Sequence, residues 1–209
     1  MRIDAGPWLQ HLDGARTLAL AGDPEGVHQV RVALRRLRVW LSFKGHEALQ
    51  EELRWLCGAL ALLRDLDVFG EVLTAQARAD LRPGAVATAV AALESQRWDL
   101  LRARLSELPA PKASRARRAV KRLERKLAER RGARGADEGE ALHRLRRSLR
   151  RLRYAQEWLG QDTSALGQEQ ERLGAACDLL ALQAFAKRQG VDVPEQLSEA
   201  IKKAFEETR

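Results

Sequence analysis

The sequence predicts an all-α protein, and three observations support this fold class. The 209 residues include six prolines, and long stretches are rich in Leu, Ala, Arg and Glu, which favour helices. Short separators that contain Gly or Pro divide these stretches, as between the antiparallel helices of a bundle. A histidine-led motif occurs twice, 115 residues apart, which indicates two related helical halves. With 45% hydrophobic and 32% charged residues, the chain is expected to be soluble and to fold around a core.

The first half, about residues 1–108, is expected to be helical between short breaks. Asp23 fits the N-cap, and Pro24 the first position, of a helix that ends before Gly45. Arg82-Pro83-Gly84 is expected to be a turn, because Pro and Gly interrupt helices. The segments predicted to be helical are residues 7–21, residues 25–44, residues 47–79 as one helix or two in series, and the stretch from this turn to residue 108.

Pro109-Ala110-Pro111 separates the halves, since two prolines cannot lie inside a helix. The second half, about residues 112–209, is expected to be helical to about residue 131, from about 137 to 159, from the turn at 160–164 to near 189, and briefly after Pro194. No apolar stretch is long enough for a transmembrane helix or a secretory signal. Cys57 and Cys177 form no CxxC pair, which fits a reducing cytoplasm.

Positive charge is concentrated in three windows. Residues 27–44 hold five basic and no acidic side chains, residues 112–134 hold eleven basic and two acidic, and residues 142–153 hold six basic and none acidic. These windows sum to +20 against +8 for the whole chain, so the remainder sums to −12. Because like charges on a compact body repel, we expect either an anionic ligand or acidic helices elsewhere in the fold to neutralise them.

The repeated motif has the pattern H-x-x-R-x-x-x-R-R-L-R. On a helix, the histidine and three arginines of each copy lie in one row about 15 Å long, and apolar residues such as Val30 and Leu34 form a separate buried face. A weaker echo relates Leu60–Asp65 to Leu173–Asp178, 113 residues apart. The row residues are His28, Arg31, Arg35 and Arg38 in the first copy and His143, Arg146, Arg150 and Arg153 in the second.

A third basic row follows the prolines and has no leading histidine. Its spacing of three and four residues keeps the side chains on one helix face. Guanidinium groups are planar forks that bind phosphate oxygens in bidentate fashion and stay charged, and a row of them suits an extended polyanion. A histidine beside them donates a hydrogen bond or, when protonated, adds charge. The members of the third row are Arg115, Arg118, Arg122 and Arg125.

Structural roles are expected for the other conspicuous side chains. Asp65 and Asp67 are expected to hold nearby arginines, and Arg36 and Arg151 point away from the rows. His11, His46 and the five tryptophans are expected in structural positions. No catalytic residue, metal or cofactor is expected, because two basic windows lack any carboxylate that could hold Mg²⁺ and no P-loop, HExxH or zinc-ligand spacing occurs.

The repeated motif resembles that of the CHAD family, the conserved histidine α-helical domain. The similarity covers Asp23–Val32, Arg35–Arg38, Leu63–Val68, His143–Arg146 and Arg150–Tyr154, which together span nearly the whole chain. Residues 1–209 are therefore expected to form one CHAD-like domain. The resemblance implies two four-helix bundles related by a pseudo-two-fold axis, with basic helices along a central surface or pore. The second half departs from the pattern at Cys177–Leu180, where the Arg-Asp-x-Asp of the first half is absent.

The resemblance also implies binding of inorganic polyphosphate and association with polyphosphate granules in the cytoplasm of bacteria. The eight residues of the two histidine-led rows would face the ligand, and the third row is added from charge alone. We expect a non-enzymatic module that binds inorganic polyphosphate, with other polyanions as further candidate ligands and no membrane partner. The alternatives are binding of nucleic-acid backbones, although few aromatic residues interleave the rows, and a role as accessory subunit of a phosphoanhydride-processing enzyme.

Overall fold

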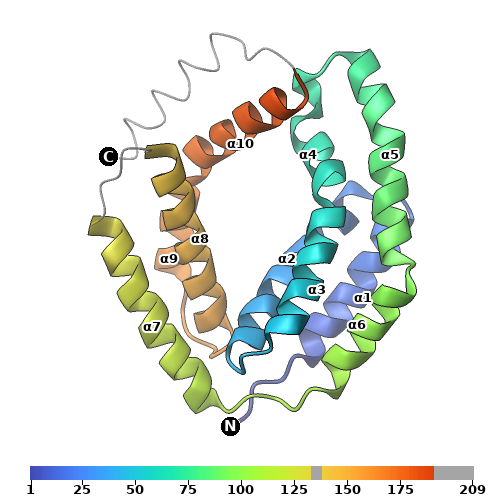
Figure 1. The fold of residues 1–209 in the computed structure, drawn as a ribbon. Coiled ribbons are helices and arrows are strands. Elements are labelled where there is room, and N and C mark those ends of the chain that lie inside the picture. Colours follow the sequence, from blue (N-terminus) through green and yellow to red (C-terminus); the bar gives the residue numbers. More distant parts are fainter. Residues whose placement is uncertain (133–137, 191–209) are drawn as a thin grey trace. The chain divides into compact units, whose positions relative to one another are not determined.

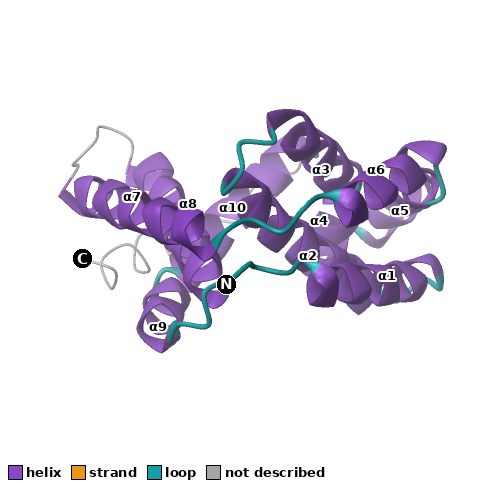
Figure 2. Cartoon of the chain, turned by 90° about the horizontal axis from the view of Figure 1, so that it is seen from below, coloured by secondary structure: helices purple, strands orange, loops and turns teal. Residues whose placement is uncertain are grey.

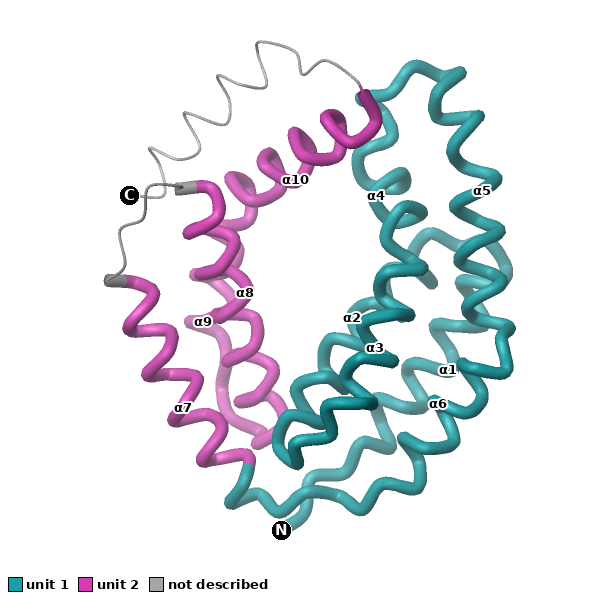
Figure 3. Tube along the Cα trace, in the orientation of Figure 1, with its two compact units in different colours: residues 1–115 teal, residues 116–209 magenta. Residues whose placement is uncertain are grey.

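The structure is a computed structural model that describes residues 1–132 and 138–190. These residues form ten α-helices and one short 3-10 helix joined by loops, with no β-strand among them (Figure 2). The predicted all-α fold class is therefore confirmed for this part of the chain. The chain divides into two compact units, residues 1–115 and 116–209, which are described separately below (Figure 3).

Unit 1 contains six α-helices, and their start and stop signals are mostly those expected. The Asp23 carboxylate accepts a hydrogen bond of 2.8 Å from the Glu25 backbone N–H, and Pro24 is the first helical residue, as predicted. The elements of the unit are α1 (Gly6–Leu20), α2 (Pro24–Ser42), α3 (Glu47–Ala59), α4 (Ala61–Phe69), the 3-10 helix η1 (Gly70–Val72), α5 (Ala75–Leu93) and α6 (Gln96–Glu107) (Figure 1).

Helix α2 is the central element of unit 1. Its predicted apolar face is confirmed, because Val30, Leu34, Leu37 and Leu41 are all inaccessible to solvent. Helix α1 packs closely along α2 at Gly26, where an added Cβ atom would lie 2.8 Å from the Cα atom of Ala19. Burial of this face fixes the rotation of α2 and, with it, the direction of the histidine-led row.

The predicted turn at Arg82-Pro83-Gly84 is wrong, since α5 continues through these residues. Proline removes one helical hydrogen bond, but tertiary contacts hold the helix on both sides of it. Ala85 and Ala89 are buried, and the Arg82 guanidinium lies 3.0 Å from the almost fully buried carboxylate of Asp67 on α4. The break instead falls at Glu94–Ser95, where the Ser95 hydroxyl accepts a hydrogen bond from the Trp98 N–H and caps α6.

The linker with Pro109 and Pro111 is bound to the start of the chain. The backbone N–H of Ile3 donates to the Pro111 carbonyl at 3.0 Å, and the N–H of Ala113 donates to the Met1 carbonyl at 3.1 Å. Lys44 adds a side-chain hydrogen bond of 2.6 Å to the Pro109 carbonyl. The expected helix break at the prolines is thus confirmed, and backbone hydrogen bonds hold the linker against the N-terminal segment.

Unit 2 contains most of α7 and three further described helices. The expected single helix before Gln189 is wrong, because the chain breaks at Leu173 between α9 and α10. The same one-residue break occurs at Leu60 between α3 and α4. The separator at 133–137 and the expected C-terminal helix after Pro194 lie outside the described residues. The helices are α7 (Ala113–Gly132), α8 (Glu138–Glu157), α9 (Ser164–Arg172) and α10 (Gly174–Arg188).

Candidate functional site

The first histidine-led row lies on α2, on the side of the helix that faces α3 and α4. All four of its side chains, His28, Arg31, Arg35 and Arg38, are half-buried. Helices α3 and α4 both pack against α2. Hydrogen bonds and charges from these two helices therefore determine the environment of the row.

The guanidinium of Arg31 in this row is held by the backbone of α3. Its Nη1 donates a hydrogen bond of 2.6 Å to the backbone carbonyl of Cys57 on α3, whereas its buried Nε has no hydrogen-bond partner. Burial is the main cause that lowers the pKa of Arg31, and Arg35 and Arg64 lower it further, against the charges of Cys57 and Asp65. Because arginine starts from a very high pKa, Arg31 stays charged. A neutral acceptor thus holds a cation in a fixed position.

His28 belongs to the same cluster, and Arg64 joins it from α4. Burial lowers the pKa of His28, and the positive charges of Arg64, Arg35 and Arg31 lower it further, with Glu25 acting in the opposite direction. His28 is therefore neutral at pH 7, able to donate or accept one hydrogen bond. The sequence did not single out Arg64. Arg64 lies in the segment Leu60–Asp65, which is weakly repeated at Leu173–Asp178. This weak repeat is the sequence feature that could have drawn attention to Arg64.

The second row lies on α8 in unit 2, and its side chains are also half-buried: His143, Arg146, Arg150 and Arg153. The Arg146 guanidinium lies 2.7 Å from the Asp178 carboxylate of α10, and Arg153 lies 3.2 Å from Glu157 on its own helix. Arg146 and Arg153 therefore have protein carboxylates as partners. Both partners lie outside the basic window, Glu157 one helical turn after it and Asp178 on α10, so the charge pattern of the window did not predict them.

Cys177 lies beside the second row. It is inaccessible to solvent, and burial raises the pKa of its thiol. Arg146 and Arg150 act against this shift, and Asp178 adds to it. A protonated, buried thiol is a poor nucleophile, so Cys177 contributes packing beside the arginines. Neither Cys57 nor Cys177 forms a disulfide with another described residue.

The third row differs from the other two because it is exposed. Arg115, Arg118, Arg122 and Arg125 are all on the open face of α7, while Val120 and Leu127 are buried. Arg125 is 3.7 Å from Glu129 one turn later. Arg130 of α7 donates to the hydroxyl of Ser148, which lies on the side of α8 opposite Arg146. The exposed row of α7 and the half-buried row of α8 thus present different environments to a ligand.

Several residues that were expected to have structural roles form ion pairs, hydrogen bonds or ring contacts within the protein. Asp67 binds Arg82, and the Arg36 guanidinium stacks 4.3 Å from the centre of the Trp8 ring. His11 forms a hydrogen bond of 3.0 Å with Gln29. Within residues 1–132 and 138–190, no group of His, Cys, Asp and Glu is arranged to hold a metal ion. None of the helices in this part of the chain is long and apolar enough to cross a membrane.

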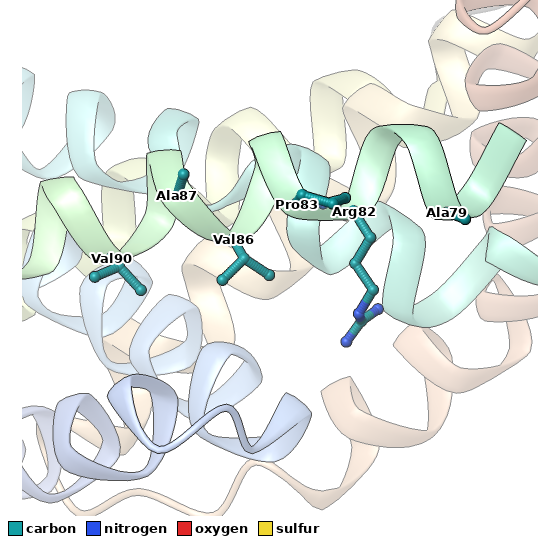
Figure 4. A pocket seen from close by; sticks show the side chains of 6 residues that line it. All are labelled: Ala79, Arg82, Pro83, Val86, Ala87 and Val90. Carbon is teal, nitrogen blue, oxygen red and sulfur yellow. The ribbon is translucent and has the colours of Figure 1, made fainter.

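Helix α5 carries a shallow hollow that has a different character from the basic rows. Ala79, Pro83, Val86, Ala87 and Val90 line it, and Arg82 is its one charged residue (Figure 4). Arg82 is already paired with Asp67. An apolar surface of this kind offers almost no charge to an anion, so the candidate site for anions remains with the rows on α2, α7 and α8.

The fold and the basic rows define a class of protein: an all-helical chain with a histidine-led row of half-buried arginines on one helix of each unit. A family model for the CHAD domain matches residues 6–187, which is most of the chain. The chain therefore belongs to the CHAD domain family, and the resemblance noted from the motif is confirmed.

Comparison with solved structures gives the same family. The crystal structure of the CHAD domain from the plant Ricinus communis is similar with a TM-score of 0.69 and 27% sequence identity, over 97% of this chain and 83% of that one. PptA from Streptomyces chartreusis is similar in fold, with a TM-score of 0.67 and 19% identity, over 98% of this chain and 91% of that one. A search of curated proteins gave no match.

Proposed function

We propose that the protein binds inorganic polyphosphate, without catalysis, through the His/Arg rows. The observation that carries this proposal is that equivalent rows on α2 and α8 hold half-buried guanidinium groups in fixed positions. Holding a buried guanidinium costs free energy, because each unsatisfied charged donor loses its hydration. A ligand rich in phosphate oxygens offsets this cost by charge-assisted hydrogen bonds.

Membership in the CHAD family supports the same ligand. The family resemblance also leads us to propose two four-helix bundles related by a pseudo-two-fold axis, and association with polyphosphate granules in the cytoplasm. Absence of catalysis is part of the proposal, because the carboxylates nearest the second row, Asp178 and Glu157, are engaged by arginines. Carboxylates used in this way are poorly placed to hold the Mg²⁺ that phosphoryl transfer uses.

Nucleic acid is the main competing ligand, and the surroundings of the rows argue against it. Proteins that bind single strands stack bases on exposed aromatic rings. Tyr154, the aromatic residue that directly follows a row arginine, is 3% exposed, so its ring is unavailable for stacking. A ligand without bases fits these rows better than one with bases.

A competition titration tests the choice of ligand. Long-chain polyphosphate and single-stranded DNA of equal total charge are titrated against the full chain at moderate salt. We expect polyphosphate to bind more tightly, and both affinities to fall as salt rises, because the arginines release counterions from the polyanion. If DNA binds more tightly, the protein is a nucleic-acid binder and the proposal is wrong.

A charge-reversal variant tests the role of the rows. Changing Arg31, Arg35, Arg146 and Arg150 to Glu is expected to abolish polyphosphate binding while circular dichroism still shows a helical protein. The matched control changes four exposed cations outside the rows, two in each unit: Arg54, Arg104, Arg172 and Lys187. If the row variant loses its helicity, the same four positions are changed to Gln. Unchanged affinity in a folded row variant would show that the rows are structural.

A further inference from the structure

The two histidine-led clusters occupy corresponding positions of the sequence repeat but have different charges. Two positions differ in a way that matters for an anion. Position 64 on α4 is Arg, whereas position 177 on α10, 113 residues later, is Cys. The last residue of α2 is Ser42, whereas the last residue of α8, 115 residues later, is Glu157.

These differences leave unit 1 more positive near its row. The unit 1 cluster consists of His28 with the arginines 31, 35, 38 and 64, and Glu25 and Asp65 are its nearby carboxylates, which gives +2 with a neutral histidine. The unit 2 cluster consists of His143 with the arginines 146, 150 and 153, and it contains Asp178 and Glu157, which gives +1. The unit 1 cluster therefore carries more positive charge than the unit 2 cluster.

The hydrogen bonds of the clusters point in the same direction. Arg31 is held by the carbonyl of Cys57, which leaves its charge uncancelled, whereas the equivalent Arg146 is held by the carboxylate of Asp178. The guanidinium groups of Arg35 and Arg64 form neither a hydrogen bond nor an ion pair with another described residue. An anion that reaches unit 2 must compete with two carboxylates, whereas unit 1 offers two half-buried guanidiniums that have no such partner.

We propose that the two halves are unequal, with the unit 1 cluster as the primary phosphate subsite and Arg64 as one of its binding residues. This inference rests on the proposed function. It adds that a short polyphosphate fills the unit 1 cluster first, and that the unit 2 cluster is filled at a higher concentration. Arg64 and Glu157, which lie outside the repeated motif, then determine the ranking of the two subsites.

Nuclear magnetic resonance of the histidine rings separates the subsites in the intact protein. Inorganic tripolyphosphate is the probe, because it is short compared with a row of about 15 Å. The ring signals are assigned with the variants His28→Gln and His143→Gln. We expect the His28 signals to shift at a lower tripolyphosphate concentration than the His143 signals. If His143 responds first, or both respond together, the inference is wrong.

Exchanging the residues that differ between the two clusters tests which of them determine the order of tripolyphosphate binding. Arg64→Cys is expected to weaken tripolyphosphate binding about tenfold, the size of effect expected for one charged hydrogen-bond donor. Glu157→Ser is expected to strengthen binding at His143 about threefold, the size of effect expected for one ion pair near the surface. Glu52→Ser is the matched control, because Glu52 pairs with Arg97 at 2.6 Å outside both clusters. Circular dichroism checks that each variant is folded.

The combined variant with Arg64→Cys, Ser42→Glu and Glu157→Ser is expected to reverse the order, so that the His143 signals respond first. An unchanged order in this folded variant would overturn the inference while polyphosphate binding itself stands. A wild-type protein that binds neither tripolyphosphate nor long-chain polyphosphate would instead contradict the proposed function. The two failures are therefore distinguishable.

Discussion

The rows on α2 and α8 have the same motif but lie in different electrostatic surroundings. Arg31 donates to a backbone carbonyl, while Arg146 pairs with Asp178 at 2.7 Å. His28 has a guanidinium, Arg64, among its neighbours, whereas the position equivalent to Arg64 in unit 2 is the buried thiol of Cys177. The motif therefore determines which side chains form the row, and residues on the packed helices determine how much positive charge the row offers to a ligand.

The largest expected effect is a loss of stability when a core leucine behind either row is truncated. It tests whether the hydrophobic cores behind the two rows contribute equally to stability. Leu34 on α2 and Leu149 on α8 are 115 residues apart, and both are inaccessible to solvent. Leu34→Ala and Leu149→Ala are each expected to lower the free energy of unfolding by about 2–5 kcal/mol, through lost apolar contact and a cavity. Denaturant unfolding of the full chain measures both. A loss below about 1 kcal/mol at either leucine would mean that its core adapts around the change.

A smaller effect is expected where the packing of the two units differs. Gly26 on α2 lies against the backbone of α1, whereas the equivalent position on α8 is Ala141. Gly26→Ala is expected to destabilise the protein by about 1–3 kcal/mol, because the helices must move apart. In the opposite exchange, Ala141→Gly is expected to cost about 0.5–1 kcal/mol through helix propensity alone. Thermal unfolding compares the two, and a stabilising Gly26→Ala would refute the close approach of α1 and α2.

The sequence was sufficient to predict the parts of the fold that depend on local chemistry. Asp23 and Pro24 define the start of α2, and Val30 with Leu34 defines its buried face, because capping and helical periodicity act within a few residues. The turn predicted at Pro83 is wrong, because the contacts that keep α5 intact come from Asp67 and from packing of Ala85. Local helix-breaking signals were outweighed there by tertiary contacts.

The candidate site was predictable in its row residues but not in their partners. The motif places Arg31 and Arg146 at equivalent positions, and both are half-buried in the structure. The Cys57 carbonyl cannot be found from side-chain patterns, because every residue has one. Asp178 stands 32 residues from Arg146, so the ion pair depends on how α10 packs against α8. Long-range packing determines these partners.

Removing the Asp178 carboxylate from unit 2 would reduce the difference in charge between the two clusters. Asp178→Asn frees Arg146 and raises the charge of the unit 2 cluster by one, so polyphosphate affinity is expected to rise about threefold to tenfold, corresponding to about 1 kcal/mol. Asp13→Asn is the matched control, because Asp13 pairs with Arg102 at 2.8 Å outside the rows and its loss changes the net charge equally. Titration calorimetry measures both variants. Equal gains in the two variants would show that net charge acts rather than the release of Arg146.

The smallest expected effect is a pH dependence that arises in unit 1. Burial and the charges of Arg64, Arg35 and Arg31 lower the pKa of His28 below its ordinary value of 6.5, against the opposing charge of Glu25. In the unfolded chain this histidine takes up its proton first as the pH falls. The stability contributed by neutral His28 is therefore complete above pH 6.5 and is lost as the pH falls from there through the lowered folded pKa.

Bound polyphosphate reverses this effect, because its negative charge favours protonated His28. We expect affinity to rise as the pH falls from 8 to about 5, with proton uptake on binding. His28→Gln should remove this part of the pH dependence, and His11→Gln, on α1, should leave it unchanged. Arg64→Cys removes the first of the opposing charges, so the rise in affinity should begin at a higher pH. A pH profile in Arg64→Cys identical to that of the wild type would show that Arg64 does not act on His28, and the electrostatic distinction between the two rows would lose its main support.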